Sequence, residues 1–148
     1  ASWALVSMAL FRQEPAAALA CLEVASPESA DPGLLLEPEG PWPFAEGWRR
    51  AFTRGVLLLL LGGQDEEARL ELERAEQLEP TAEGANNLGV ALHRCGHKDD
   101  ARSAWALAEA RFPGYADAGA NAEAETPSAI TTHPLRRLAA RNDYRAFY

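Results

Sequence analysis

Three residues that can bind metals or act as nucleophiles lie close together in the stretch HRCGHKDD, residues 93–100. His93, Cys95 and His97 carry the imidazole and thiolate groups that bind zinc, and a Cys beside a His can form a catalytic thiolate. A closed zinc site needs four ligands, and no CxxC pair or second cluster supplies the others. Cys95 also falls on an apolar helical stripe, and His97 follows Gly96, which ends the helix. We therefore predict a turn here and no metal site.

The patterns of the common catalytic sites are also missing from the chain. A Ser or Cys nucleophile needs a base that a third group holds in place, and the remaining histidine, His133, stands just before Pro134. No GxSxG run is present, and GGQDEE at 62–67 lacks the Lys and Ser/Thr of a phosphate-binding loop. The sequence therefore predicts no catalytic residue, no cofactor and no enzyme activity.

Composition limits the class of protein further. The chain has 148 residues, 47% of them apolar, which suits one domain covering 1–148, and its many Ala and Leu residues favour helix. With 14 basic and 22 acidic residues the net charge is −8, which argues against nucleic-acid binding.

The apolar run GVLLLLLGG is far below the roughly 20 residues that span a bilayer, so no membrane span is predicted. Cys21 and Cys95 are interpreted as free thiols in a reducing compartment, which favours a cytoplasmic location.

The chain repeats itself when it is shifted by 33 residues. Six positions then agree in type: Gly63 with Gly96, Leu59 with Leu92, Ala68 with Ala101, Leu72 with Trp105, Ala75 with Ala108, and Pro80 with Pro113. A fixed period of this size is typical of a solenoid, in which one unit cannot bury its apolar face without a neighbour.

One unit, residues 82–113, predicts a helix hairpin. Its first half has an apolar stripe with helical spacing, at Leu88, Ala91, Leu92 and Cys95, and its second half opens with acidic residues and ends at Pro113. Small side chains at Gly89 and Ala101 should let the two helices approach closely, with Trp105 filling the space beside them.

The same positions carry a family resemblance. The pattern of Leu-Gly, a large residue, Gly, Ala, an aromatic residue, Ala and Pro resembles the tetratricopeptide repeat (TPR); it stands at Leu88, Gly89, Leu92, Gly96, Ala101, Trp105, Ala108 and Pro113. The unit at 47–80 is looser, since Gly55 and Val56 stand where Leu-Gly is expected, and 1–26 resembles a degenerate unit. The resemblance implies an all-α fold, a short right-handed α-solenoid of TPR-like hairpins.

Two segments lie outside the repeats. Residues 27–46 hold five prolines and predict an extended insertion, either a functional lid or a solvated linker. After Pro113, residues 114–148 should form a capping segment: a helix that Thr126-Pro127 stops, and a final basic helix in which Arg137, Arg141 and Arg145 are four residues apart. That tail helix either caps the solenoid or docks a partner or an acidic surface of the body.

In TPR proteins the first helices of the hairpins line a concave groove that holds a peptide or a partner helix. By register this implies a partner-binding set of eight residues: Trp48, Arg50, Arg54, Leu57, Asn86, Asn87, Val90 and Arg94. Asn87 holds the place of an asparagine that contacts the ligand backbone in many members. Arg50 and Arg54 hold places that are basic in chaperone-binding members, but they and the asparagine come in the wrong order of repeats, so chaperone binding is not predicted.

Alternatives remain open for these residues and for the function. Arg50 and Arg54 can be helix charges paired with nearby Glu, Asn87 can support a local turn, and Trp48 is the aromatic residue most readily assigned to a partner. The main hypothesis is a non-enzymatic adaptor or scaffold with a protein or peptide partner. The alternatives are a homo-oligomer built through the basic tail at 133–148 and, ranked last, a small-molecule enzyme or sensor under the 27–46 loop.

Overall fold

The computed structural model describes residue 9 and residues 12–24 and 47–132. Within these ranges the protein is all-helical and has no strand. Six helices follow in chain order: α2 (Pro15–Val24), α3 (Trp48–Leu61), α4 (Asp65–Leu78), α5 (Ala82–Arg94), α6 (Lys98–Arg111) and α7 (Ala116–Glu123). The Pro-rich insertion expected at 27–46 and the basic helix expected at 133–148 lie outside the described residues.

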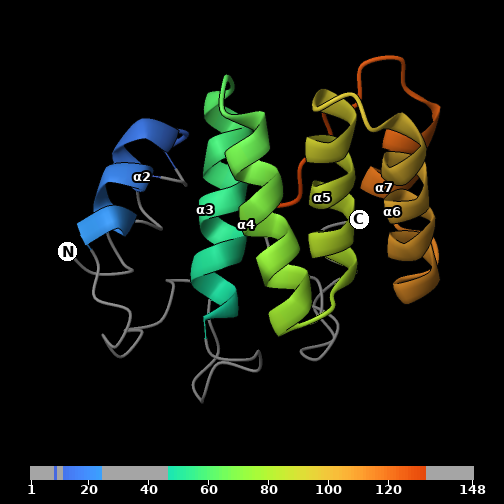
Figure 1. Cartoon of the computed structure of the whole chain (residues 1–148), viewed down its shortest axis with the longest axis horizontal. Helices are drawn as coiled ribbons and strands as arrows, with labels where there is room; N and C mark the ends of the chain where they lie inside the picture. The colour runs from blue at the N-terminus through green and yellow to red at the C-terminus, as the bar shows by residue number, and fades with distance from the viewer. Residues whose placement is uncertain (1–8, 10–11, 25–46, 133–148) are drawn as a thin grey trace.

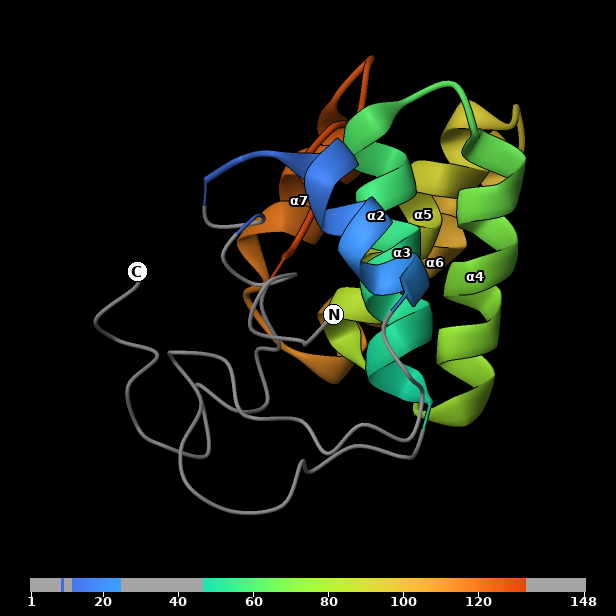
Figure 2. The same ribbon diagram turned by 90° about the vertical axis from the view of Figure 1, so that its left-hand side faces the viewer.

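The helices form a row in which each described helix packs against the next one along the chain. α3 pairs most closely with α4 and α5 with α6, while α4 and α5 join the two pairs (Figure 1). α2 packs on α3 at one end of the row, and α7 packs on α6 and α5 at the other. Figure 2 shows α4 on one side of α3 and α7 on the opposite side.

Charges and caps in the local sequence fix where these helices begin and end. The side chain of Thr81 accepts a hydrogen bond from the Gly84 N–H at 2.9 Å, which caps α5, and Asp65, Glu66 and Glu67 place negative charge at the positive end of α4. The turn after α5 is a Schellman motif: Gly96 N–H donates to the His93 carbonyl and His97 N–H to the Leu92 carbonyl. Gly96 has a φ of 89°, which glycine adopts without strain.

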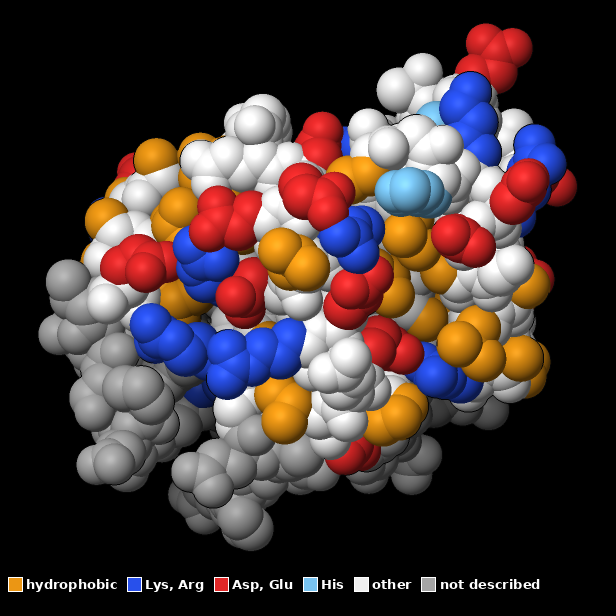
Figure 3. Space-filling model, in the orientation of Figure 1, with side chains coloured by type: hydrophobic (Ala, Val, Ile, Leu, Met, Phe, Trp, Pro, Cys, Tyr) orange, Lys and Arg blue, Asp and Glu red, His pale blue; other side chains and the backbone are white. Residues whose placement is uncertain are grey.

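The hydrophobic core has two parts. The larger part runs from α3 to α7 and contains Phe52, Leu72, Val90, Trp105 and other buried side chains, with Ile130 packed against it. The smaller part joins α2 to α3 through Ala9, Ala18, Leu22 and Leu57, and Leu19 packs against both. The face that α4 presents to solvent mixes acidic and basic side chains (Figure 3).

Two glycines let the paired helices touch. A Cβ atom at Gly89 would stand 2.3 Å from the Trp105 indole, and one at Gly55 would stand 2.5 Å from Leu72. Gly55 is therefore the structural counterpart of Gly89, 34 residues earlier, whereas Leu72 precedes Trp105 by 33. The alignment with a constant shift of 33, which placed Gly55 opposite Leu88, is wrong by one residue in this helix, because α3 is one residue longer than α5.

None of the helices in residues 9, 12–24 and 47–132 is long and apolar enough to cross a membrane.

The glycine contact generates a stability prediction. Gly89→Ala should lower the free energy of unfolding by about 1–2 kcal/mol, because overpacking against the Trp105 ring outweighs the gain in helix propensity. Urea denaturation followed by circular dichroism measures the change. Gly119→Ala in α7 is the matched control: its Cβ would meet only the end of the Glu109 side chain, so stability should be unchanged or slightly higher. Equal effects of the two substitutions would contradict the close-approach argument.

Candidate functional site

The eight residues predicted to bind a partner lie in three different environments. Trp48, Leu57 and Val90 are buried in the core, and Trp48, only 1% exposed, stacks on Phe52 with ring centroids 4.7 Å apart. The arginines Arg50, Arg54 and Arg94 lie nearer the surface in contacts with other parts of the chain. Asn86 and Asn87 are wholly buried on α5.

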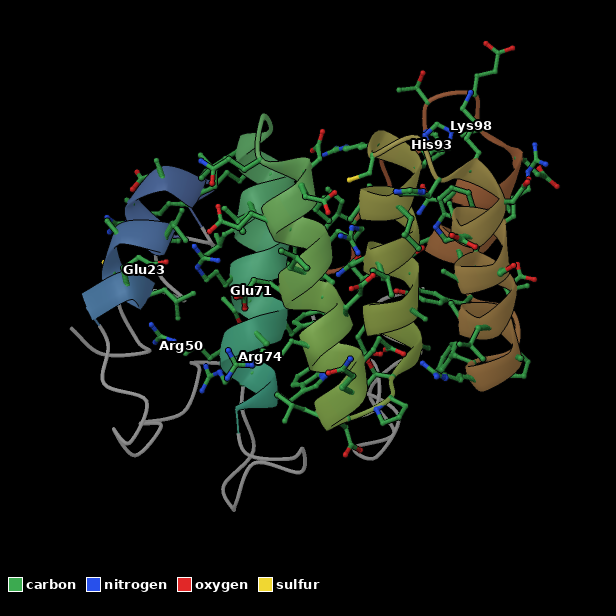
Figure 4. All side chains as sticks on the ribbon, viewed as in Figure 1. Glu23, Arg50, Glu71, Arg74, His93 and Lys98 are labelled. Atoms are coloured by element: carbon green, nitrogen blue, oxygen red, sulfur yellow. The ribbon has the colours of Figure 1, made fainter. Side chains whose placement is uncertain are left out.

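Arg54 joins three helices through ion pairs. Its Nε atom lies 2.8 Å from Glu23 of α2, and its two terminal nitrogens lie 2.6 Å from Glu67 and 3.4 Å from Glu71 of α4. Figure 4 shows Glu23 and Glu71 on the helices either side of α3. Hydrogen bonds from Glu23 and Glu67 raise the pKa of the guanidinium above its ordinary value. The pairing with Glu that the sequence left open for Arg54 is therefore present.

The other two arginines bind backbone carbonyls across helix boundaries. Arg50 Nη1 donates to the Leu22 carbonyl at 3.0 Å, near the C-terminal end of α2, where helical carbonyls have no partner within the helix. Arg94 Nη1 donates to the Leu59 carbonyl at 2.8 Å and lies 3.8 Å from Asp65. All three arginines thus hold neighbouring helices of the same chain together.

The two asparagines of α5 meet an extended stretch of the same chain. Asn87 binds both main-chain groups of Thr131: its Nδ2 donates to the carbonyl at 2.8 Å, and its Oδ1 accepts from the N–H at 2.9 Å. Residues 127–132 have no helix or turn, and they return to α5 more than 40 positions after Asn87. A side-chain amide that binds N–H and C=O of one residue reproduces the pairing offered by a neighbouring β-strand.

A third asparagine, Asn121 of α7, binds the main chain of Ala129, two residues before Thr131, in the same way. Its Nδ2 donates to the Ala129 carbonyl at 2.8 Å, and its Oδ1 accepts from the Ala129 N–H at 2.9 Å. Asn86 connects the two clamps, because its Oδ1 accepts from Asn121 at 2.9 Å and its Nδ2 donates to the Ala129 carbonyl at 3.0 Å. An extended chain presents the main-chain groups of alternate residues on one side, so Ala129 and Thr131 match two such clamps.

Sequence reasoning missed Asn121 and the segment that it binds. The signal is a short repeat: Gly-Ala-Asn at 84–86 recurs at 119–121. The two copies are 35 residues apart, whereas the repeat has a period of 33, so the repeat alignment gives Asn121 no asparagine counterpart in α5.

The side chain of Thr131 is bound as completely as its backbone. Its hydroxyl donates to the Asp117 carboxylate at 2.7 Å, and Tyr115 and Asn86 contribute further hydrogen bonds to the same oxygen. Since the single hydroxyl hydrogen points to Asp117, Tyr115 must be the donor in the Tyr115–Thr131 bond. The hydroxyl then donates one bond and accepts one from Tyr115, and Asn86 Nδ2 makes a longer contact of 3.4 Å with the same oxygen.

The turn that holds His93, Cys95 and His97 has a structural role in the Schellman motif. His93 packs beside Trp105 with ring centroids 6.1 Å apart, near the start of α6 at Lys98 (Figure 4). Burial, together with a hydrogen bond to Glu66, raises the pKa of the Cys95 thiol and so favours its unreactive protonated form. The described part of the chain contains no group of three or more His, Cys, Asp or Glu side chains arranged to hold a metal ion.

The Arg54 junction predicts a loss of stability when the charge is removed. Arg54→Gln should lower the free energy of unfolding by about 1–2 kcal/mol, because Glu23, Glu67 and Glu71 would repel one another without the guanidinium. The variant should also speed amide hydrogen exchange in α2. Arg102→Gln is the control, since Arg102 is 72% exposed and approaches one carboxylate at 3.7 Å. A variant as stable as this control would rule out a structural role for the junction.

The clamp on Thr131 gives a second prediction. Asn87→Ala should lower the free energy of unfolding by about 1–3 kcal/mol, because it leaves the N–H and C=O of Thr131 without their partner. Hydrogen exchange read by NMR should show the Thr131 amide losing protection while the α6 amides keep theirs. Gln77→Ala, which removes an exposed amide from α4, should change neither quantity. Unchanged exchange at Thr131 would mean that the clamp does not hold the segment.

Comparison with known proteins gave no match to this chain among protein-family models, curated proteins or solved structures. The resemblance to the TPR family therefore rests on the spacing of residues such as Gly89, Trp105 and Ala108.

Proposed function

We propose that the chain is a non-enzymatic interaction module that binds a protein partner through an extended peptide segment. In this proposal the helix row is a short right-handed α-solenoid of TPR-like hairpins, and the face of α5 and α7 that carries Asn86, Asn87 and Asn121 is its binding face. The observation that carries the proposal is the pair of asparagine clamps, each of which binds the N–H and the C=O of one residue in an extended chain.

Main-chain clamps suit a peptide-binding protein for a physical reason. Every non-proline residue carries the same N–H and C=O groups, so Asn87 and Asn121 supply affinity without fixing the partner's sequence. The asparagines belong to two helices that the core holds in place, so the clamps are positioned before a peptide arrives, and little ordering is needed on the protein side.

The residues that we propose to bind the partner differ from those that the sequence-based hypothesis named. Arg50, Arg54 and Arg94 are engaged within the chain, and Trp48, Leu57 and Val90 are buried, so the proposed contacts centre on the asparagines. Both cysteines are free thiols, which supports the proposed reducing, cytoplasmic location. The homo-oligomer hypothesis depends on residues 133–148, which lie outside the described part of the chain, and no described contact favours it or the small-molecule hypothesis.

A peptide selection tests the proposal. A library of random 12-residue peptides is selected on the wild-type chain and on the Gly-Ser variant, in which Gly-Ser-Gly-Ser-Gly replaces residues 127–131. This variant keeps the main chain but removes the contacts of Ile130 and the Thr131 hydroxyl, so its own segment holds the clamps less tightly. Enriched peptides should bind with an affinity that falls at least tenfold in Asn87→Ala, and fluorescence polarisation measures it. Gln77 lies on α4, so the control variant Gln77→Ala should bind the enriched peptides like the wild type. If neither chain yields a peptide whose binding depends on Asn87, the proposed function is wrong.

A further inference from the structure

The segment at 127–132 has the contacts of a bound ligand. Its main chain is held at two alternate residues, Ala129 and Thr131, by side chains of α5 and α7, and one of its side chains is fully hydrogen-bonded. Residues 124–126, which connect it to α7, are exposed. We infer that residues 127–132 are an internal ligand that competes with external peptides, and that the site prefers peptides carrying an aliphatic residue followed by Thr or Ser. This inference rests on the proposed function and names its ligand class.

The hydroxyl of Thr131 sets the first requirement. Asp117 accepts its hydrogen and Tyr115 donates to its oxygen, so a ligand without a hydroxyl would lose both bonds at a buried position and would leave the Asp117 carboxylate without this donor. Sites that hydrogen-bond a ligand hydroxyl discriminate strongly against the analogue that lacks it. A phosphorylated Thr would bring its negative charge against the Asp117 carboxylate, so the unmodified residue is the preferred form.

Apolar contacts set the second requirement. Ile130 packs against the main core between the two clamped residues, and Pro127 is buried at the start of the segment. Proline at the positions of Ala129 or Thr131 is excluded, because it has no N–H for Asn121 or Asn87 to accept. The contacts together describe a ligand of the form Pro-x-small-aliphatic-Thr/Ser.

Occupation by the internal segment lowers the affinity for an external peptide. If the clamps are free in only a fraction of molecules, the apparent dissociation constant rises by the inverse of that fraction. A substitution within residues 127–132 that weakens the internal segment and leaves the clamps unchanged must therefore strengthen binding of the external peptide. That inverse relation separates a competing ligand from a segment that only completes the fold.

The test uses the peptide TPSAITT, residues 126–132, with blocked ends. The Gly-Ser variant should bind it at least tenfold more tightly than the wild type does. TPSAIST should bind like TPSAITT, whereas TPSAIVT, which keeps the shape and loses the hydroxyl, should bind at least tenfold more weakly. Equal affinity of the wild type and the Gly-Ser variant would overturn the competition, and equal affinity for TPSAITT and TPSAIVT would overturn the hydroxyl requirement.

Point variants keep the inference testable if the Gly-Ser variant does not fold. Thr131→Val should weaken the internal segment, so this chain should bind TPSAITT several-fold more tightly than Thr131→Ser, its matched control. In the wild type, saturating TPSAITT should speed hydrogen exchange at the amides of Ala129 and Thr131. Equal binding by the Val and Ser variants, or unchanged exchange at both amides, would show that the peptide does not replace the segment.

Failure of the inference can be told from failure of the proposed function. If the Gly-Ser variant binds library peptides through Asn87 but does not bind TPSAITT, only the internal-ligand inference fails. If it binds neither, while its circular dichroism shows intact helices, the proposed function fails with it.

Discussion

Three buried asparagine side chains constrain the face of α5 and α7 on which residues 127–132 lie. Asn86, Asn87 and Asn121 each carry a carbonyl oxygen and an NH2 group, and an unpaired buried group of this kind costs about 1–3 kcal/mol. The main chain at Ala129 and Thr131 pairs with all three, and the Asn86–Asn121 bond uses much of the remaining capacity. The face of α5 and α7 is therefore stable only while an extended chain covers it or water reaches it.

That constraint depends in turn on how closely α5 and α6 approach. Gly89 lets the Trp105 ring lie against α5, and from there the indole N–H donates to the Asn86 carbonyl at 3.1 Å. The same helix is thus fixed on one side by Trp105 and offers its asparagines on the other. Gly55 and Leu72 make the corresponding contact between α3 and α4, but α3 has Phe52 and Thr53 where α5 has Asn86 and Asn87. The packing repeats from pair to pair, whereas the polar clamps do not.

The helical fold could be predicted from the sequence, because short-range patterns determine it. Apolar residues at helical spacing, Gly96 after α5 and acidic residues at the start of α6 act within a few positions, and each predicted boundary of this kind lies close to the observed one. The one-residue error at Gly55 arose because a constant shift cannot register an extra residue inside a helix. The turn at His93, Cys95 and His97 was also predictable, since a glycine with positive φ ends a helix whatever chemistry its neighbours could perform.

The binding face could be predicted only in part. Asn87 was chosen from the family resemblance, but its partner, Thr131, is 44 residues away, and nothing local links the two. The arginines could not be assigned from the sequence either. Arg50, Arg54 and Arg94 look the same in sequence whether their charges face a partner or carboxylates of the same chain. Glu23, Glu67 and Glu71 decide the matter for Arg54, and their convergence follows from packing between helices that the sequence does not place.

Affinity and selectivity come from different groups at the proposed binding face. The clamps at Asn87 and Asn121 bind groups that nearly every residue possesses, so alone they would accept many extended segments, in the way that an exposed sheet edge does. Asp117 and Tyr115 add a demand that only a hydroxyl meets. An internal segment that meets this demand protects the clamps from unrelated chains, because a competitor must match the hydroxyl contacts as well as the main-chain bonds before it can replace residues 127–132.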